Sequence, residues 1–418
     1  MELSYYISII LLIAGLFFVS WVSRKIFESW FFPGAFFPLI WSLYMTISFL
    51  FAPEFQPNLI GVIMIILGSI LVSIGASLFP LKVKSTYKKN KSKIKINFLF
   101  LSGILLTFIS AIGFVFVLSI GFSWFKLEQN LLNLYILPNF FATERYNEVQ
   151  SLPNNIKIVM FLTYPASLLS GFTYPLLKGA KRLFSFLPIF ITIIYGALFA
   201  VRSGVLLSII LTFSGMVCAK IYFQHDLKSW FNKVFIGGIS SSLLLFGIYI
   251  LFQWLRGGPE NYFIIDELIL SAKAGILGSF SAFTIWFSNY SLSQDLSLGL
   301  NTFAAPMEIL GLTERASGFY KDFISIGPSV TNIYSAFRGI VSDFGLIGSL
   351  IFLGFFGYIS AISFYLTSKR NIYAIVPLSI FYTFTLFSPL ISIFTFNSII
   401  ISFIIFFLVI KLSHAEFE

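Results

Sequence analysis

Residues Asn332 to Gly348 read NIYSAFRGIVSDFGLIG, and they join a long polar segment to the hydrophobic run Leu346–Leu366. Arg338 and Asp343 stand five residues apart in this stretch. That spacing is about one and a half helical turns, so both charges are expected near one rim of the segment. Three glycines beside them permit close approach of the backbone: Gly339, Gly345 and Gly348. We therefore predict a fixed electrostatic site where a membrane-spanning helix meets water.

A simpler interpretation of the same two charges needs no ligand. Arg338 can lie along the apolar segment and keep its charged end in water, as long basic side chains do at membrane boundaries. Asp343 can stabilise the start of a helix, where an acidic group is favourable. The local sequence alone leaves both interpretations open.

The composition indicates a membrane protein. Hydrophobic residues make up 58% of the 418 residues and charged residues only 11%, a balance that soluble domains do not have. The first hydrophobic run, Tyr5–Val22, has spanning length and ends at basic residues rather than at a small-residue cleavage site, so we expect it to be retained. One cysteine and two distant histidines predict neither a disulfide nor a metal site: Cys218, His225 and His414.

Hydropathy predicts an all-α polytopic membrane protein, a single integral membrane domain over residues 1–418 with about eleven transmembrane helices (ten to twelve). Segments at that depth must be helical, because lipid offers no hydrogen-bond partner to the backbone. The predicted spans are 3–23, 31–53, 57–80, 98–121, 158–177, 183–201, 205–223, 234–254, 344–366, 373–389 and 394–411.

Basic residues are divided unevenly between alternate connections. With the N-terminus outside, 18 of the 27 basic residues and 4 of the 17 acidic residues fall on the inner side. Positive residues mark the cytoplasmic side, so we predict a multi-pass protein of the bacterial cytoplasmic (inner) membrane with a cytoplasmic C-terminus. The net charge of +10 follows from this topology, and we predict no nucleic-acid partner. The basic cytoplasmic loop, residues 82–97, is interpreted as an orientation signal that contacts anionic lipid.

Two long segments are predicted on the outer face. The first outer loop covers residues 123–156, and the large outer loop covers residues 255–337, between the eighth and ninth spans. The apolar middle of the large loop, Ile276–Tyr290, predicts a helix that lies on the interface or dips into it. A loop of this length with so much apolar sequence is expected to be functional rather than disordered.

Three arginines are predicted at the outer rim, each beside a glycine or another small residue. They are Arg202, Arg256 and Arg338. A guanidinium presents a planar fork of donors that suits phosphate oxygens, so together they could bind a lipid-linked pyrophosphate. Each could instead anchor a helix end at the headgroups. Arg202 differs from the others because its connection, VRSG at 201–204, is so short that a polar group there is costly unless it is used.

Acidic residues of the same face are candidates for a general base acting on a sugar hydroxyl. We favour Asp343 among them. The other candidates are Glu260, Asp266, Glu267, Glu308 and Asp322.

The pattern Asn-x-Tyr-x-x-x-Arg, followed by Asp-Phe-Gly-x-x-Gly before a late span, resembles the oligosaccharide repeat-unit polymerases of the Wzy family, which make O-antigen and capsule. Residues 201–204 (VRSG) and 278–283 (GSFSAF) add to the resemblance. It implies a GT-C-like, metal-independent glycosyltransferase without a cofactor. Such an enzyme transfers a growing glycan from undecaprenyl diphosphate to the sugar end of a fresh lipid-linked repeat unit, outside the cytoplasmic membrane.

The resemblance also implies roles for residues of this chain. The catalytic residues would be Arg202, Arg338 and Asp343, and the substrate-binding residues would be Arg256, Tyr334, Asn332 and Arg145. The implied partners are the undecaprenyl-diphosphate-linked oligosaccharide, membrane lipids, a chain-length regulator and a flippase.

This sequence departs from the family in one spacing. Some polymerases carry a glycine eleven residues after an outer-loop arginine, whereas here Gly215 follows Arg202 by thirteen residues and Gly348 follows Arg338 by ten. The related glycan ligases use a histidine on the outer face, and the predicted topology leaves none there, which favours a polymerase.

Two other functions are open to a protein of this composition. A lipid-linked oligosaccharide flippase would carry charges at the bilayer midplane and an internal repeat, and neither is visible in the predicted spans. A glycan ligase of the same architecture differs in its acceptor. A purely structural membrane protein would not be expected to gather arginines and acids on one face.

Overall fold

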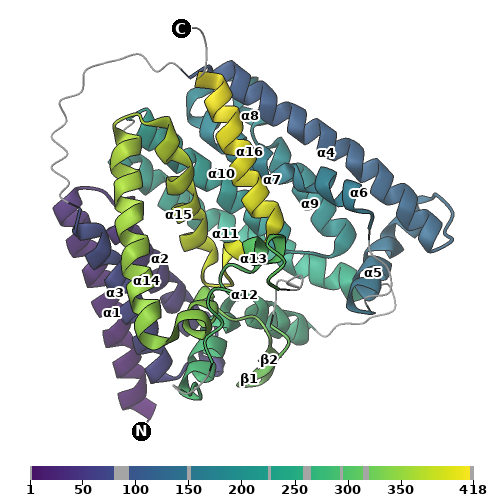
Figure 1. Cartoon of the computed structure of the whole chain (residues 1–418). Helices are drawn as coiled ribbons and strands as arrows, with labels where there is room; N and C mark the ends of the chain where they lie inside the picture. The colour runs from purple at the N-terminus through teal and green to yellow at the C-terminus, as the bar shows by residue number, and fades with distance from the viewer. Residues whose placement is uncertain are drawn as a thin grey trace. The chain divides into compact units, whose positions relative to one another are not determined.

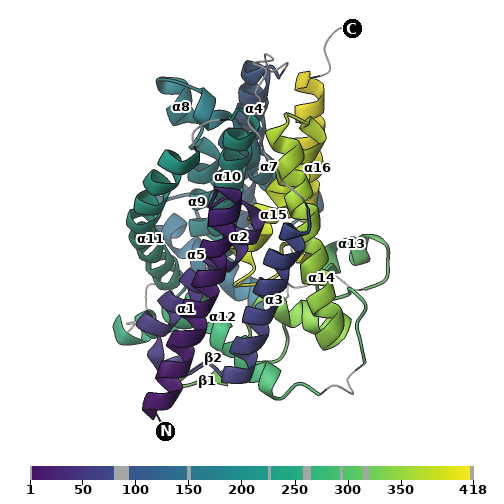
Figure 2. The ribbon, with the colours of Figure 1, turned by 90° about the vertical axis from the view of Figure 1, so that its left-hand side faces the viewer.

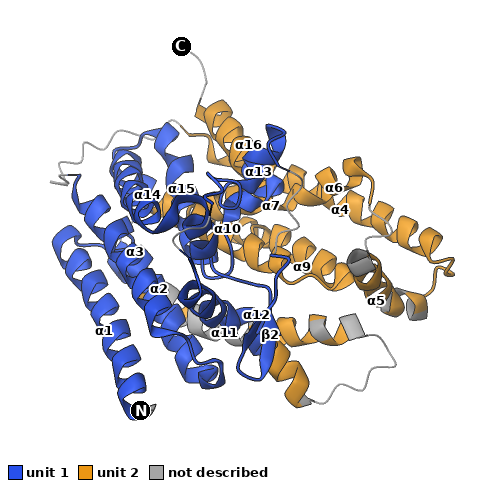
Figure 3. Ribbon diagram, turned by 60° about the horizontal axis from the view of Figure 1, so that its bottom comes forward, with its two compact units in different colours: residues 1–91, 221–231, 273–400 blue, residues 92–220, 232–272, 401–418 orange. Residues whose placement is uncertain are grey.

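The computed structural model describes residues 2–79, 94–147, 152–224, 227–257, 265–291, 295–313 and 320–414. These residues are helical apart from their loops and one two-stranded hairpin. They form two compact units (Figure 3). Unit 1 contains residues 1–91, 221–231 and 273–400, and unit 2 contains residues 92–220, 232–272 and 401–418.

The elements follow one another along the chain as Figure 1 labels them. The α-helices are α1 (Glu2–Phe27), α2 (Pro33–Phe51), α3 (Leu59–Ser77), α4 (Ile96–Trp124), α5 (Leu131–Asn147), α6 (Asn154–Phe161), α7 (Thr163–Thr173), α8 (Ala180–Phe184), α9 (Leu187–Phe199), α10 (Ser203–Tyr222), α11 (Leu227–Gly257), α12 (Ile265–Ser288), α13 (Ala304–Ile309), α14 (Ala336–Ser368), α15 (Ile375–Phe387) and α16 (Asn397–His414). The strands are β1 (Ile324–Ile326) and β2 (Ser329–Thr331), and short 3-10 turns lie at Pro53–Phe55, Tyr174–Leu176, Ile372–Ala374 and Ile393–Thr395.

Ten helical segments of the described residues are long and apolar enough to cross a membrane. Large apolar side chains stay exposed along several of them, as on α1 and α4, which is expected of helices that face lipid. The prediction of an all-α polytopic membrane protein is therefore confirmed. The ten segments are Leu3–Phe27, Pro33–Phe51, Leu59–Ser77, Ile96–Trp124, Asn154–Leu176, Ala180–Phe199, Ser203–Tyr222, Asp266–Ser288, Ala336–Ser368 and Asn397–His414.

The described helices differ from the predicted spans in residues 255–337. The helix predicted at Ile276–Tyr290 is the later part of α12, which begins at Ile265 and has spanning length. Asp266 and Glu267 in its first turn, with Lys273 one turn and a half later, lower the local hydropathy and hide the start of the helix. The position of residues 255–337 on the outer side stays a prediction.

Four other predicted segments compare with the structure as follows. The predicted span 373–389 is the shorter apolar segment Ile372–Phe387, and the predicted span 234–254 lies within α11. The predicted first outer loop, 123–156, contains the helix α5. Of the basic loop 82–97, residues 82–93 lie outside the described part of the chain.

Unit 1 is built around the close approach of α3 and α14, which Figures 1 and 2 show side by side. Glycines recur every seven residues on α3, at Gly61, Gly68 and Gly75, and face three different neighbours. A Cβ added at Gly75 would lie 1.8 Å from the carbonyl oxygen of Gly354 in α14. Such small-residue contacts let two helices pack backbone to backbone, as they do in membrane interiors.

The two ends of unit 1 are formed by different elements. The C-terminal end of α1, with Arg24 and Lys25, meets the N-terminal end of α2, since the Ser20 hydroxyl donates to the carbonyl of Ala35 at 2.6 Å. The C-terminal end of α3 lies there too, because Gly34 contacts Ala76. At the opposite end the hairpin turn packs on the 3-10 turn Pro53–Phe55: Gly327 has φ +56°, and a Cβ there would lie 2.1 Å from the Glu54 carbonyl oxygen. The hairpin is thus fixed to the end of unit 1 opposite Arg24 and Lys25.

Unit 2 packs α4, α7, α9 and α10 by similar contacts. A Cβ at Gly171 would lie 1.9 Å from the Thr212 carbonyl oxygen, and one at Gly215 would lie 2.4 Å from the Leu168 carbonyl oxygen. The Tyr195 hydroxyl donates to the carbonyl of Ser110 at 2.7 Å and joins α9 to α4. These contacts position the short connection between α9 and α10 that contains Arg202.

Candidate functional site

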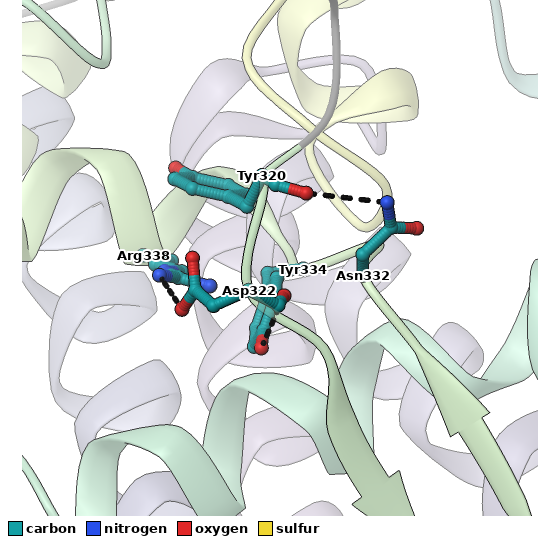
Figure 4. Close-up of polar contacts among 5 residues, drawn as sticks. All are labelled: Tyr320, Asp322, Asn332, Tyr334 and Arg338. Atoms are coloured by element: carbon teal, nitrogen blue, oxygen red, sulfur yellow. Dashed lines mark hydrogen bonds and ion pairs between the residues drawn. The ribbon is translucent and has the colours of Figure 1, made fainter. Parts of the chain in front are cut away.

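The hairpin β1–β2 brings two parts of the predicted site together at the start of α14. Its strands pair in antiparallel register, with Ile324 opposite Thr331, so the residues before β1 lie beside those after β2. The Asn332 side-chain amide donates to the carbonyl of Tyr320 at 3.2 Å, and the Tyr334 hydroxyl donates to the carbonyl of Asp322 at 3.3 Å (Figure 4). We refer to residues 320–334 as the strap.

The first turn of α14 is held in place by a different part of unit 1. Ser335 precedes the helix in an extended conformation, and the backbone N–H of Ala336 donates to the carbonyl of Ser388, after α15, at 2.8 Å. The Trp41 indole N–H donates to the Ser388 hydroxyl at 3.1 Å. Arg338, the third residue of α14, is therefore carried by a buried and rigid helix start.

The Arg338 guanidinium lies among aromatic rings, and the residue is only 7% exposed. Its Cζ is 3.9 Å from the ring centroids of both Tyr320 and Tyr334, and 5.1 Å from that of Trp286 in α12. The two tyrosine rings are nearly perpendicular, at 83°. Tyrosine and tryptophan faces attract a cation, so the rings hold the guanidinium without using its N–H donors.

One edge of this guanidinium is paired and the rest is not. A terminal nitrogen forms an ion pair with Asp322 of the strap, whose side chain is 61% exposed (Figure 4). The Nε and the other terminal nitrogen are buried and have no hydrogen-bond partner among the described residues. Buried donors are nearly always satisfied in proteins, and an exception calls for a ligand, water or ion. The arrangement is suited to an anion that spans several N–H groups.

Further hydroxyl groups lie near Arg338, and two of them are also buried without a hydrogen-bond partner among the described residues. A Cβ added at Gly339 would lie 3.2 Å from the Tyr320 hydroxyl and 3.4 Å from Oγ1 of Thr302. The hydroxyls of Thr302 and Ser335 are buried without a hydrogen-bond partner in the described part of the chain. Burial raises the pKa of Tyr320 above its ordinary value, against the opposing effect of Arg338, so its phenol stays a neutral hydrogen-bond donor.

Asp343 does not pair with Arg338 and holds a loop instead. It is fully buried, and its Oδ1 accepts hydrogen bonds from the backbone and side-chain nitrogens of Asn301, both at 3.0 Å. Its Oδ2 accepts from the backbone N–H of Thr302. Both oxygens are thus used to position Thr302, and a role of Asp343 as general base stays a prediction.

A break in α14 follows directly. Gly345 has φ +67° and ψ −175°, a conformation open in practice only to glycine, and it divides the helix into two parts. Ahead of the break the carbonyls of Ser342 and Asp343 accept hydrogen bonds from the backbone N–H groups of Ser297 and Leu298, each at 3.1 Å. The predicted span began at Phe344, and neither the break nor the short helix before it was predicted.

The other predicted arginines belong to unit 2. Ala200, with φ +49°, ends α9, and Arg202 follows before α10 begins at Ser203. The Arg202 Cζ lies 3.9 Å from the ring centroid of Tyr249 in α11, again a cation over an aromatic ring. The side chains of Arg145 and Arg256 lie outside the described residues.

The remaining acidic candidates are dispersed. Glu308 accepts a hydrogen bond from the Asn397 side chain at 2.7 Å, Asp266 and Glu267 are exposed at the start of α12, and Glu260 lies outside the described residues. Among the residues that the structure describes, no group of three or more His, Cys, Asp or Glu side chains could hold a metal ion. The Arg338 guanidinium is the cation of the site, Asp322 is its ion-pair partner, and the walls around it are aromatic.

Sequence reasoning missed several contributors to this site. Tyr320, Trp286 and Thr302 were not singled out, and Asp322 was one acid among several. A signal existed for the strap: Gly-Pro at 327–328 between apolar, β-branched residues predicts a hairpin, and a hairpin would have placed Asp322 near Tyr334.

Comparison with known proteins gave no match: no protein-family model, curated protein or solved structure matches this chain. The description of the site is therefore based on its own geometry.

Proposed function

We propose that the chain is a membrane glycosyltransferase that polymerises undecaprenyl-diphosphate-linked oligosaccharide repeat units into a surface polysaccharide, O-antigen or capsule. The reaction takes place at the outer face of the bacterial cytoplasmic membrane. The observation that carries the proposal is the buried Arg338 guanidinium, which is fixed by aromatic rings while two of its nitrogens lack a partner among the described residues.

A diphosphate fits these donors. A guanidinium binds phosphate oxygens through two parallel N–H bonds, and in a buried site such bonds are strong. The developing negative charge of a leaving diphosphate is stabilised most by donors that are already oriented. Arg338 stands in the first turn of α14, where the helix dipole adds to the attraction.

The other residues of the site have supporting roles in this proposal. Asp343 positions the Thr302 hydroxyl, and Tyr334 and Asn332 fix the strap and line the path of the sugars. Arg202, also fixed on a tyrosine ring, binds anionic substrate in unit 2. Arg256 is proposed to bind substrate from its predicted place at the outer rim and from the resemblance, and Arg145 from the resemblance alone.

A second function has one observation in its favour. The break at Gly345 lies inside the candidate span Ala336–Ser368, which also carries the buried Arg338 and Asp343. Transporters bind anionic groups at such broken helices. A flippase for the same lipid-linked oligosaccharide is therefore the alternative.

Deleting the gene and restoring it with variants tests the proposal. Wild type, Arg338→Ala, Arg338→Lys and Arg202→Ala are compared by separating the surface glycan by size, with membrane levels checked by immunoblotting. We expect the polymer ladder to collapse to a single repeat unit with Arg338→Ala, and also with Arg338→Lys, because lysine keeps the charge but lacks the planar fork. Arg202→Ala should shorten the polymer or abolish it.

Arg182→Ala is the matched control. Its guanidinium also lies over a tyrosine ring, 4.3 Å from the centroid of Tyr174, but Arg182 is exposed. It should leave the ladder unchanged. Long chains in well-expressed Arg338→Ala would contradict the proposal, and lipid-linked units that accumulate on the cytoplasmic side would favour the flippase.

A further inference from the structure

We propose that Asp322 is the general base of the glycosyl transfer, and that before the donor binds it serves as the counter-ion of Arg338. The inference rests on the proposed function and assigns a step of its chemistry to a residue of the strap. It depends on one juxtaposition, the ion pair between a buried arginine and an exposed aspartate that lie sixteen residues apart.

Asp322 differs from the other described acidic candidates in what its carboxylate contacts. Both oxygens of Asp343 are held by N–H donors of the loop at residues 301–302, and Glu308 accepts from Asn397. Asp322 pairs with the Arg338 guanidinium, and its side chain is 61% exposed. The Asp322 carboxylate therefore lies beside the Arg338 guanidinium and is accessible to an incoming sugar.

Its backbone is held independently of its side chain. The Tyr334 hydroxyl bonds to the Asp322 carbonyl, the Asn332 amide bonds to the Tyr320 carbonyl, and the hairpin turn packs on the Glu54 backbone. The carboxylate can therefore leave Arg338 by rotating its side chain, while the strap stays where it is. A rotation of this kind is a fast, local motion.

Donor binding exchanges one anion for another. The diphosphate takes the unpartnered Nε and terminal nitrogen of Arg338 together with the nitrogen that Asp322 had held. Asp322 is displaced by a few ångströms at most, since its backbone is fixed. Donor binding thereby frees the carboxylate oxygens of Asp322 to accept a hydrogen bond from the acceptor sugar.

The transfer then proceeds in one step with Asp322 as proton acceptor. The acceptor sugar hydroxyl attacks the anomeric carbon of the donor glycan, and the new C–O bond forms as the C–O bond to the diphosphate breaks. The hydroxyl proton goes to the Asp322 carboxylate, and the electron pair goes to the diphosphate oxygen on Arg338. When undecaprenyl diphosphate leaves, Asp322 gives its proton to solvent and pairs with Arg338 again.

This exchange predicts opposite effects of one substitution on binding and on turnover. Asp322→Asn removes the competing charge and the base with little change of shape. Binding of undecaprenyl diphosphate to the purified full-length protein in lipid nanodiscs should become tighter, by about fivefold, the range of a partly exposed ion pair. Turnover of lipid-linked oligosaccharide extracted from the deletion strain should fall by about a hundredfold or more in kcat, the contribution of a general base, with a lowered KM.

Matched variants separate these effects from damage to the fold. Asp322→Glu keeps a carboxylate and should recover part of the turnover, Arg338→Ala should lose diphosphate binding, and Glu128→Gln, at an exposed acid before α5, should behave as wild type.

Two results would overturn the inference and leave the proposed function standing. In one, wild type elongates glycan and Asp322→Asn keeps its kcat. In the other, Asp322→Asn loses diphosphate binding and turnover together. If wild type neither binds undecaprenyl diphosphate nor elongates the extracted substrate, the proposed function fails and the inference fails with it.

Discussion

Asp343 binds Asn301 twice, through the backbone nitrogen and the side-chain amide, both at 3.0 Å from the same carboxylate oxygen. With the Thr302 N–H on the other oxygen, a fully buried charge is satisfied by one short loop. Asp343→Ala should lower the free energy of unfolding by about 3 kcal/mol or more, because N–H donors to a buried charge are left unpaired. The loss is measurable as a lower melting temperature in detergent.

Limited proteolysis locates that effect. We expect faster cleavage within residues 295–313 in Asp343→Ala, whereas Asp266→Asn should show the wild-type pattern. Equal stability of Asp343→Ala and wild type would mean that the loop is held by its other contacts, the backbone bonds of Ser297 and Leu298.

The conformation of Gly345 predicts a second stability effect. At φ +67° and ψ −175°, Gly345→Ala should cost about 1–3 kcal/mol in backbone strain, and its Cβ would meet Leu296 at 3.3 Å. Gly15→Ala in α1 is the control, because a Cβ there meets nothing within 4 Å. Gly345→Ala should melt at a lower temperature than Gly15→Ala, and equal melting temperatures would argue against the break in α14.

The contact between α3 and α14 predicts a defect of packing. Gly75→Ala would place a Cβ 1.8 Å from the Gly354 carbonyl oxygen, so the helices must separate, at about 1–3 kcal/mol. At Gly103 of α4 the nearest atom would be 3.4 Å away, an ordinary contact. We expect Gly75→Ala to give less monodisperse protein on size-exclusion chromatography than Gly103→Ala, and a reversed order would contradict this packing.

The buried phenol of Tyr320 predicts a difference at alkaline pH. Folding raises its pKa above the ordinary value of 10.0. The unfolded chain therefore loses this proton first, so the stabilisation is complete below pH 10 and declines as the pH rises toward the folded value. Tyr320→Phe has no such proton to lose.

Above pH 10, where tyrosine and lysine side chains lose their protons, wild type should lose melting temperature more steeply than Tyr320→Phe. Lysines contribute equally to both proteins, so the difference between the two slopes isolates Tyr320. Parallel slopes would mean that this phenol is open to solvent.

Most of the fold was predictable because lipid imposes simple rules. Apolar runs of spanning length had to be helices, and the structure has helices at each of them. The exception is α12, whose start was hidden by Asp266, Glu267 and Lys273: the two acids are exposed in its first turn, and Lys273 pairs with Glu54 at 3.0 Å. A pairing between residues so far apart in the chain cannot be read from local composition.

The site was predictable only where it is local in sequence. Asn332, Tyr334 and Arg338 stand within seven residues, and the structure brings them together. Trp286 and Thr302 come from other elements, so spacing could not reveal them. Arg338 and Asp343 do not form one site with each other as expected. Arg338 pairs with Asp322 of the strap, and Asp343 accepts hydrogen bonds from the loop at residues 301–302.

The hydrogen bonds that fix the strap end on the carbonyls of Tyr320 and Asp322, and its turn packs on the backbone of Glu54. Its outward residues, Phe323 and Val330, are more than half exposed and are absent from that bonding. Substitutions at these two positions would therefore change the surface offered to a sugar without moving Asp322 or Arg338. If the chain is the polymerase proposed above, its sugar preference could therefore change by substitutions at Phe323 and Val330 while the Asp322–Arg338 pair stays intact.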